Sequence, residues 1–107
     1  MKDDSVYLLH IADAIRRIEE FTSGLDGKGF MASRLVQSAV IREFEVIGEA
    51  SKQVSEKFKK SAPGIPWKRI SGMRDKLIHG YFGVDLDAVW ETISKDLPEL
   101  KRRLGEL

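Results

Sequence analysis

The chain has 107 residues, no cysteine and a formal net charge of +1. This length predicts a single domain over residues 1–107, and the lack of cysteine excludes disulfide bonds and thiolate metal sites. The acidic start and the lack of a long apolar run argue against a signal peptide and a membrane-spanning helix, so we expect a cytoplasmic protein.

Helical periodicity dominates the first half of the chain. Apolar residues at three- and four-residue steps predict an amphipathic helix over residues 4–22. The glycine-rich stretch that follows, including Gly27-Lys28-Gly29, is predicted to be a turn. A wider apolar stripe then predicts one long helix over residues 30–60. The positions that define these two patterns are Leu8, Ile11, Ile15 and Ile18, and then Val36, Val40, Phe44, Ile47, Val54 and Phe58.

Proline, glycine and aspartate mark the elements of the second half. Pro66 suits the first position of a third helix over residues 66–79, which Gly80 would end. Asp85 can cap a fourth helix, and Pro98 should interrupt or kink it. No strand pattern is evident. We therefore predict an all-α protein, an up-and-down bundle of four to five helices.

Positive charge is concentrated in one part of the chain. Residues 52–79 hold eight Lys or Arg and two Asp or Glu, whereas the segments before and after them are net negative. Such a stretch can attract a polyanion. The alternative for Lys57, Lys59 and Lys60 is a solvated helix end, since cations suit the negative C-terminus of a helix.

Three residues of the third predicted helix form a chemically plausible set. With about 100° per residue, Asp75 and His79 lie about 140° and 180° from Ile70, which together with Met73 and Leu77 would face the core. The four-residue spacing lets the Asp75 carboxylate orient the His79 ring. Arg74 adds a forked donor that suits phosphate.

RNA cleavage is a reaction that so small a set could support, because the 2′-hydroxyl of RNA is itself the nucleophile. The protein then needs a base, an acid and a cation. Two chains related by a two-fold axis would supply two copies of His79. A metal site is not expected, since His10 and His79 are the two histidines and Glu43, Glu45 and Glu49 suit salt bridges.

The stretch Arg74-x4-His79-x-Tyr81 resembles the R-x4-H-x-Y signature of the HepT-like toxins, a branch of the HEPN superfamily of helical ribonucleases. The segments VIGEA at 46–50, IPWKRISGMRDKLIHGYFGVD at 65–85 and VWETISKDLPEL at 89–100 are similar to that family in the same order. The likeness covers residues 4–104.

This resemblance implies a single HEPN-type domain that dimerises around the motif helix. It implies the toxin of a type VII toxin–antitoxin system, a metal-independent endoribonuclease that needs no cofactor and cleaves RNA such as tRNA or mRNA. Arg74, His79 and Asp75 would be catalytic. A minimal nucleotidyltransferase antitoxin would transfer AMP onto Tyr81 and so inhibit cleavage.

Other interpretations stay open. The chain could instead be a non-catalytic helical subunit that binds a nucleotidyltransferase and nucleotide. Tyr81 and Phe82 could simply pack the turn before the fourth helix, and Gly80 could loosen it. Trp67 and Trp90 are expected to anchor the core or a dimer interface.

Overall fold

The computed structural model describes residues 3–77 and 83–106, with only the backbone of Arg74 and Lys76. These residues are mostly helical and include no β-strand. The predicted all-α class is therefore confirmed. No helix in the described part of the chain is both long enough and apolar enough to cross a membrane.

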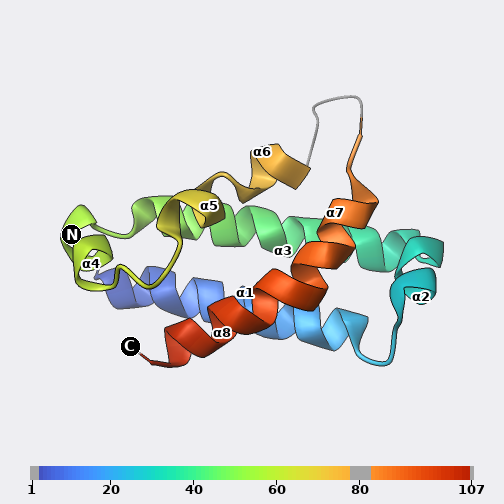
Figure 1. Ribbon diagram of the computed structural model, residues 1–107, viewed down its shortest axis with the longest axis horizontal. Helices are drawn as coiled ribbons and strands as arrows, with labels where there is room; N and C mark the ends of the chain where they lie inside the picture. The colour runs from blue at the N-terminus through green and yellow to red at the C-terminus, as the bar shows by residue number, and fades with distance from the viewer. Residues whose placement is uncertain (1–2, 78–82, 107) are drawn as a thin grey trace.

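Two long helices form the centre of the molecule. Helix α1 (Asp4–Thr22) confirms the first predicted helix, and its N-terminus is capped by Asp3. Helix α3 (Arg34–Gln53) runs antiparallel beside it (Figure 1). Their facing residues are almost completely buried, so this pair supplies most of the core. The buried residues are Ile11, Ile15 and Ile18 of α1, and Val40, Phe44 and Ile47 of α3.

The prediction of one helix over residues 30–60 is wrong. The structure has α2 (Gly27–Ala32), α3 and α4 (Glu56–Ser61) instead. Ser33 and Ser55 cause the breaks, because each hydroxyl accepts a hydrogen bond from the backbone N–H three residues later and caps a new helix. The predicted turn at Gly27-Lys28-Gly29 is the first half of α2, which Asp26 caps.

The third predicted helix is also divided. Residues Trp67–Ser71 form α5 and residues Met73–Leu77 form α6. The N–H of Gly72 still donates to the carbonyl of Lys68 at 3.1 Å, but its φ of −89° and ψ of 1° depart from α-helical values and separate α5 from α6. Pro66 is the residue before α5 and its carbonyl accepts from Ile70 N at 3.0 Å. The predicted terminator, Gly80, lies outside the described residues.

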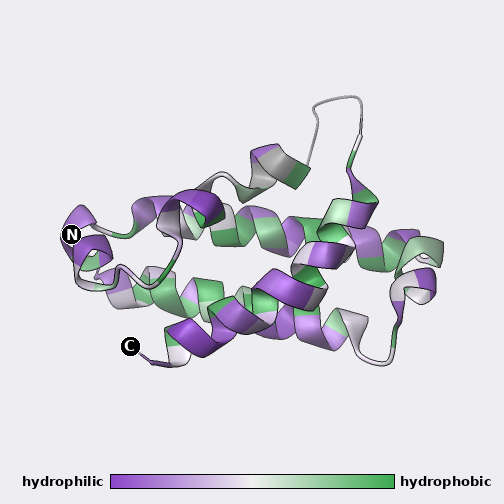
Figure 2. Cartoon of the chain, viewed as in Figure 1, coloured by the Kyte–Doolittle hydropathy of each residue, from purple (hydrophilic) through white to green (hydrophobic). Residues whose placement is uncertain are grey.

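The last helix begins at Asp85 as predicted. It comprises α7 (Leu86–Glu91), the π-helical turn η2 (Thr92–Asp96) and α8 (Leu97–Gly105). Pro98 explains the wide turn, because it has no N–H and its ring would clash with the carbonyl four residues earlier in an α-helix. The helix therefore continues past Pro98. It crosses the α1–α3 pair (Figure 1). Along this helix, hydrophobic residues alternate with hydrophilic residues, which form a stripe on its outer side (Figure 2).

The short helices are fixed to this centre by aromatic and polar contacts. The Trp67 ring packs edge-on against Phe58 at 6.2 Å, and Trp90 stacks on buried Phe30 at 5.2 Å. Both tryptophans pack against the core, which is one of the two roles predicted for them. At the N-terminal end of α1, Asp4 accepts hydrogen bonds from the N–H and hydroxyl of Ser55. The predicted number of four to five bundle helices is not confirmed, because short helices replace two of the long ones.

Candidate active site

Helix α6 carries Arg74 and Asp75 of the predicted catalytic set, α5 directly precedes it, and each helix is anchored by one buried side chain. Ile70 of α5 and Leu77 of α6 are both 2% exposed, and Met73 packs against the core with partial exposure. These are the three residues predicted to face the core. A helix of five residues is not stable alone in water, so these contacts hold the motif in position.

Helix α3 provides a close-fitting surface for α5. A Cβ atom at Gly48 would lie 3.6 Å from the carbonyl oxygen of Ile70 and 3.7 Å from that of Ser71, which is ordinary van der Waals contact, so α5 packs directly on this part of α3. The hydroxyl of fully buried Ser51 donates to the Gly48 carbonyl and lies 3.1 Å from the Ser71 hydroxyl. The sequence analysis missed this contact. In the sequence, the only indication of this contact is a pair of small residues, Gly48 and Ser51, which are three positions apart and lie on one face of α3.

The structure describes only part of the predicted catalytic set. Arg74 and Asp75 are consecutive residues of α6, and Asp75 is exposed. His79 and Tyr81 lie outside the described residues, as do Gly80, Phe82 and the Arg74 side chain. The direction of Asp75 was predicted from a helix that continues without interruption from Ile70. The break at Gly72 interrupts that helix, so the predicted direction no longer follows. The proposed contact between Asp75 and His79 therefore stays a prediction.

The chain segments on either side of His79 and Tyr81 are nevertheless held together. The backbone N–H of Asp85 donates to the carbonyl of Leu77 at 3.0 Å. The Asp85 carboxylate accepts from Ala88 N at 3.0 Å and caps α7, as predicted. The stretch that carries the histidine and the tyrosine thus starts and ends at two backbone positions fixed to each other.

A cavity of about 410 Å³ adjoins the motif helix, between α5–α6 and η2–α8. Its apolar wall includes Ile70, Met73, Leu97 and Leu100. Charged residues from both sides surround it: Lys68, Arg69, Asp96, Glu99 and Arg103. The sequence analysis did not predict this cavity, because its two walls, residues 64–73 and 92–103, are separated in the chain.

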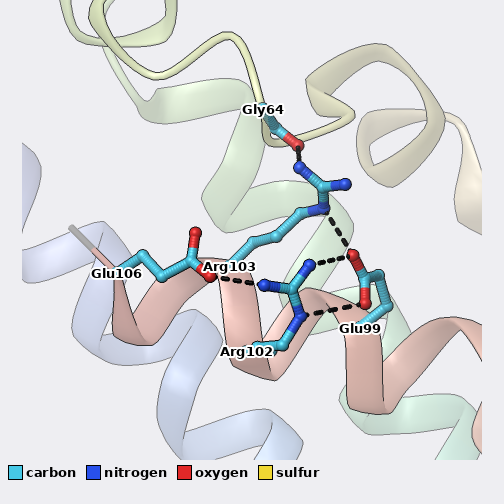
Figure 3. Close-up of polar contacts among 5 residues, drawn as sticks. All are labelled: Gly64, Glu99, Arg102, Arg103 and Glu106. Carbon is cyan, nitrogen blue, oxygen red and sulfur yellow. Dashed lines mark hydrogen bonds and ion pairs between the residues drawn. The ribbon is translucent and has the colours of Figure 1, made fainter.

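One side of the cavity is fixed by a charged network (Figure 3). Arg103 donates to the carbonyl of Gly64 and to Glu99, both at 2.8 Å, while Arg102 pairs with Glu99 and Glu106. A Cβ atom at Gly64 would lie 3.0 Å from the Arg103 guanidinium, so glycine leaves room for this contact. The hydrogen bond from Arg102 lowers the pKa of Glu99, which keeps the network ionised.

The predicted basic stretch is partly neutralised. Arg69 pairs with Asp96 at 3.3 Å and Lys59 with Glu56 at 3.7 Å. By contrast, Lys57, Lys60 and Lys68 are exposed and form no ion pair with another described residue. Lys59 and Lys60 do lie in the last turn of α4, where the helix-end interpretation puts them. Free positive charge therefore remains on α4 and α5.

Two glutamates of α3 form the salt bridges that the sequence predicted. Glu43 lies 3.5 Å from Arg17, and Glu49 lies 3.5 Å from Lys52. The buried Glu43 oxygen lacks a hydrogen-bond partner among the described residues. Within the same residues, no group of three or more His, Cys, Asp or Glu side chains could hold a metal ion.

Comparison with known proteins identifies the family. A family model described as Ribonuclease HepT-like matches residues 11–107. The chain belongs to the HepT-like ribonuclease family. The resemblance of the motif to this family is therefore confirmed, and the match includes α3, the motif stretch and the last helix.

Curated relatives agree with this assignment. A protein of Thermococcus cleftensis named "Probable ribonuclease HepT" is 48% identical over 94% of this HepT-like chain and 92% of its own length. A protein of Caldanaerobacter subterraneus named as a candidate RNase is 40% identical, over 100% of this chain and 96% of its own.

A third relative is longer. A protein of Methanocaldococcus jannaschii, named as a gamma-glutamylcyclotransferase and candidate RNase, is 46% identical over 96% of this chain and 46% of its own length. No solved structure matches this HepT-like chain significantly.

Proposed function

We propose that this HepT-like protein is an endoribonuclease and the toxin of a type VII toxin–antitoxin system. The observation that carries the proposal is the family match over residues 11–107, which includes Arg74-x4-His79-x-Tyr81. The relatives named as ribonucleases support it. The chain would act as a single HEPN-type domain in the cytoplasm.

The proposed reaction uses the 2′-hydroxyl of RNA as nucleophile. Its oxygen bonds to the adjacent phosphorus while the bond to the 5′-oxygen breaks, which leaves a 2′,3′-cyclic phosphate. One His79 accepts the proton of the 2′-hydroxyl, and a second protonates the 5′-oxygen. Arg74 stabilises the charge on the phosphorus centre, and Asp75 orients the imidazole.

A homodimer would complete this site. One chain holds one His79, and the reaction needs a base and an acid at the same time. A two-fold axis beside α6 would bring two copies of Arg74 and His79 together. No metal ion is required in this scheme, because side chains supply both proton transfers and the positive charge.

A nucleotidyltransferase antitoxin is the proposed regulator. The Tyr81 hydroxyl oxygen bonds to the α-phosphorus of ATP, pyrophosphate leaves, and the phenolic proton passes to a base of the antitoxin. The bound AMP adds bulk and a negative phosphate near the RNA site. It would repel the RNA backbone and inhibit cleavage.

The test compares wild type, His79→Ala and Tyr81→Phe for cleavage of a tRNA and an mRNA in the presence of EDTA. We expect His79→Ala to lower cleavage about 10²- to 10⁴-fold. Tyr81→Phe should keep cleavage but gain no AMP mass when the antitoxin is co-expressed.

Three results would contradict parts of this scheme. Cleavage that persists in His79→Ala removes the histidine mechanism, and cleavage abolished by EDTA removes metal independence. A wild-type protein that cleaves nothing, yet binds the nucleotidyltransferase and nucleotide, is the non-catalytic subunit.

A further inference from the structure

The cavity between α5–α6 and η2–α8 lies next to α6, the helix that includes Arg74 of the proposed reaction. Gly72 and Met73 form part of its wall, and Met73 directly precedes Arg74 in the chain. In the proposed reaction Arg74 binds the phosphate that is cleaved, so the neighbouring nucleotides would lie close to α6. The cavity is a hollow in the surface next to α6.

The size and the wall of the cavity suit a nucleobase. Its volume of about 410 Å³ lies in the range of sites that hold small organic molecules. Ile70, Leu97 and Leu100 are each at most 5% exposed and form a buried layer beneath the cavity, while the partly exposed Met73 offers it apolar surface. An apolar surface can contact the face of any base, which gives binding without strong sequence preference.

The charges around the cavity leave one cation available to an anionic group such as a phosphate. Asp96 and Glu99 are already paired with Arg69 and with the two arginines of α8. Lys68 is exposed and has no ion pair among the described residues. Arg69 is 65% exposed, but it is paired with Asp96 at 3.3 Å. The cavity mouth therefore offers the Lys68 ammonium to one phosphate.

We propose that this cavity is a subsite for one nucleotide of the RNA strand, beside the phosphate that is cleaved. The base lies against Met73, above the buried Ile70, Leu97 and Leu100, and the phosphate contacts Lys68. The network of Arg103, Gly64 and Glu99 keeps the far wall in place and does not touch the RNA. This subsite rests on the proposed ribonuclease function and adds the positioning of its substrate.

The experiment measures binding rather than cleavage. The probe is a labelled 2′-O-methyl RNA strand of about ten nucleotides, within the usual range of single-strand sites. It cannot be cleaved, because its 2′-oxygen carries no proton. Affinity is measured by fluorescence anisotropy at several salt concentrations for wild type, Lys68→Gln and Lys57→Gln. Lys57 is the matched control, since it is exposed, unpaired among the described residues and outside the cavity wall.

Lys68→Gln should weaken binding and reduce the slope of log affinity against log salt by about 0.7, the value for one lost phosphate contact. Lys57→Gln should leave the slope unchanged. When the bases of the probe are removed one at a time, only one of these removals should lower the affinity of wild type for the probe. Equal slopes for the two variants, or no RNA binding by wild type, would overturn the subsite.

A protein occupant would also be visible. If Lys68→Gln changes self-association in sedimentation but not the RNA slope, the cavity belongs to a protein interface and the subsite is wrong. Failure of the ribonuclease proposal is a separate result. In that case the probe binds with the Lys68-dependent slope, but ordinary RNA is not cleaved.

Discussion

Helices α1 and α3 have 19 and 20 residues, whereas α5 and α6, which lead into the motif and include its Arg74, have five each. The long pair buries a continuous set of Ile, Val and Phe side chains between its two members. The short pair is held by Ile70, Leu77 and the contact at Gly48. The difference separates two tasks in one small domain. The long helices supply stability, and the short ones keep polar residues near the surface.

Removing a core side chain should have the largest effect on stability. Phe44 is 1% exposed, and Phe44→Ala should lower the free energy of unfolding by about 3–5 kcal/mol through lost burial and a cavity. Urea denaturation measures the change. Leu35→Ala is the control, because Leu35 lies on the same helix but is 81% exposed. Similar losses for both variants would mean that α3 is not the core of the stable region.

A change in the motif should separate activity from stability. Arg74→Ala should reduce RNA cleavage about 10²- to 10³-fold, because it removes the cation from the phosphate. Arg74→Lys should retain part of the activity, since it keeps the charge but loses the forked geometry. Both variants should unfold at nearly the wild-type temperature, because Leu77 still anchors α6. A large drop in the unfolding temperature would show that the motif region also carries stability.

The ion pair between Arg17 and Glu43 should have an intermediate effect. Arg17→Met leaves the Glu43 carboxylate, 12% exposed, without its cation and should cost about 1–3 kcal/mol. Glu43→Met removes the unbonded buried oxygen and should be neutral or stabilising. The two variants are compared by urea denaturation. A larger loss for Glu43→Met would mean that the pair stabilises the scaffold.

The smallest effect is expected at the end of α1. The hydrogen bonds from the hydroxyl and the N–H of Ser55 lower the pKa of Asp4. Its stabilising contribution is therefore complete above about pH 4, the usual range of an unfolded aspartate, and disappears as the pH falls through the lowered value. The difference in thermal midpoint between wild type and Asp4→Asn should follow this course. A difference that stays constant as the pH falls through this range would contradict the prediction.

Much of the fold could be predicted from apolar spacing. The pattern correctly identified the first helix, the cap at Asp85 and the core positions on α1 and α3. It failed at Ser33 and Ser55, because the apolar stripe continues across both breaks. A serine within such a stripe can either stay in a helix or cap the next one. Gly72 was likewise compatible with a continuous helix.

The candidate site was only partly accessible to sequence reasoning. The motif gave Arg74, Asp75, His79 and Tyr81 from their spacing and from the family resemblance. The contact at Gly48 and the cavity depend on segments that meet only after folding. Local spacing contains no information about such contacts.

The π-helical turn has a consequence for the length of the last helix. In η2 the N–H of Leu97 bonds to the carbonyl five residues earlier, so this turn holds one residue more than an α-helical turn. Deleting one residue from η2, together with Pro98→Ala, would preserve the relative rotation of the flanking helices. The cavity wall formed by Thr92, Asp96 and Leu97 would shorten. The additional residue of this turn therefore affects the cavity wall rather than the rotation of the helices on either side.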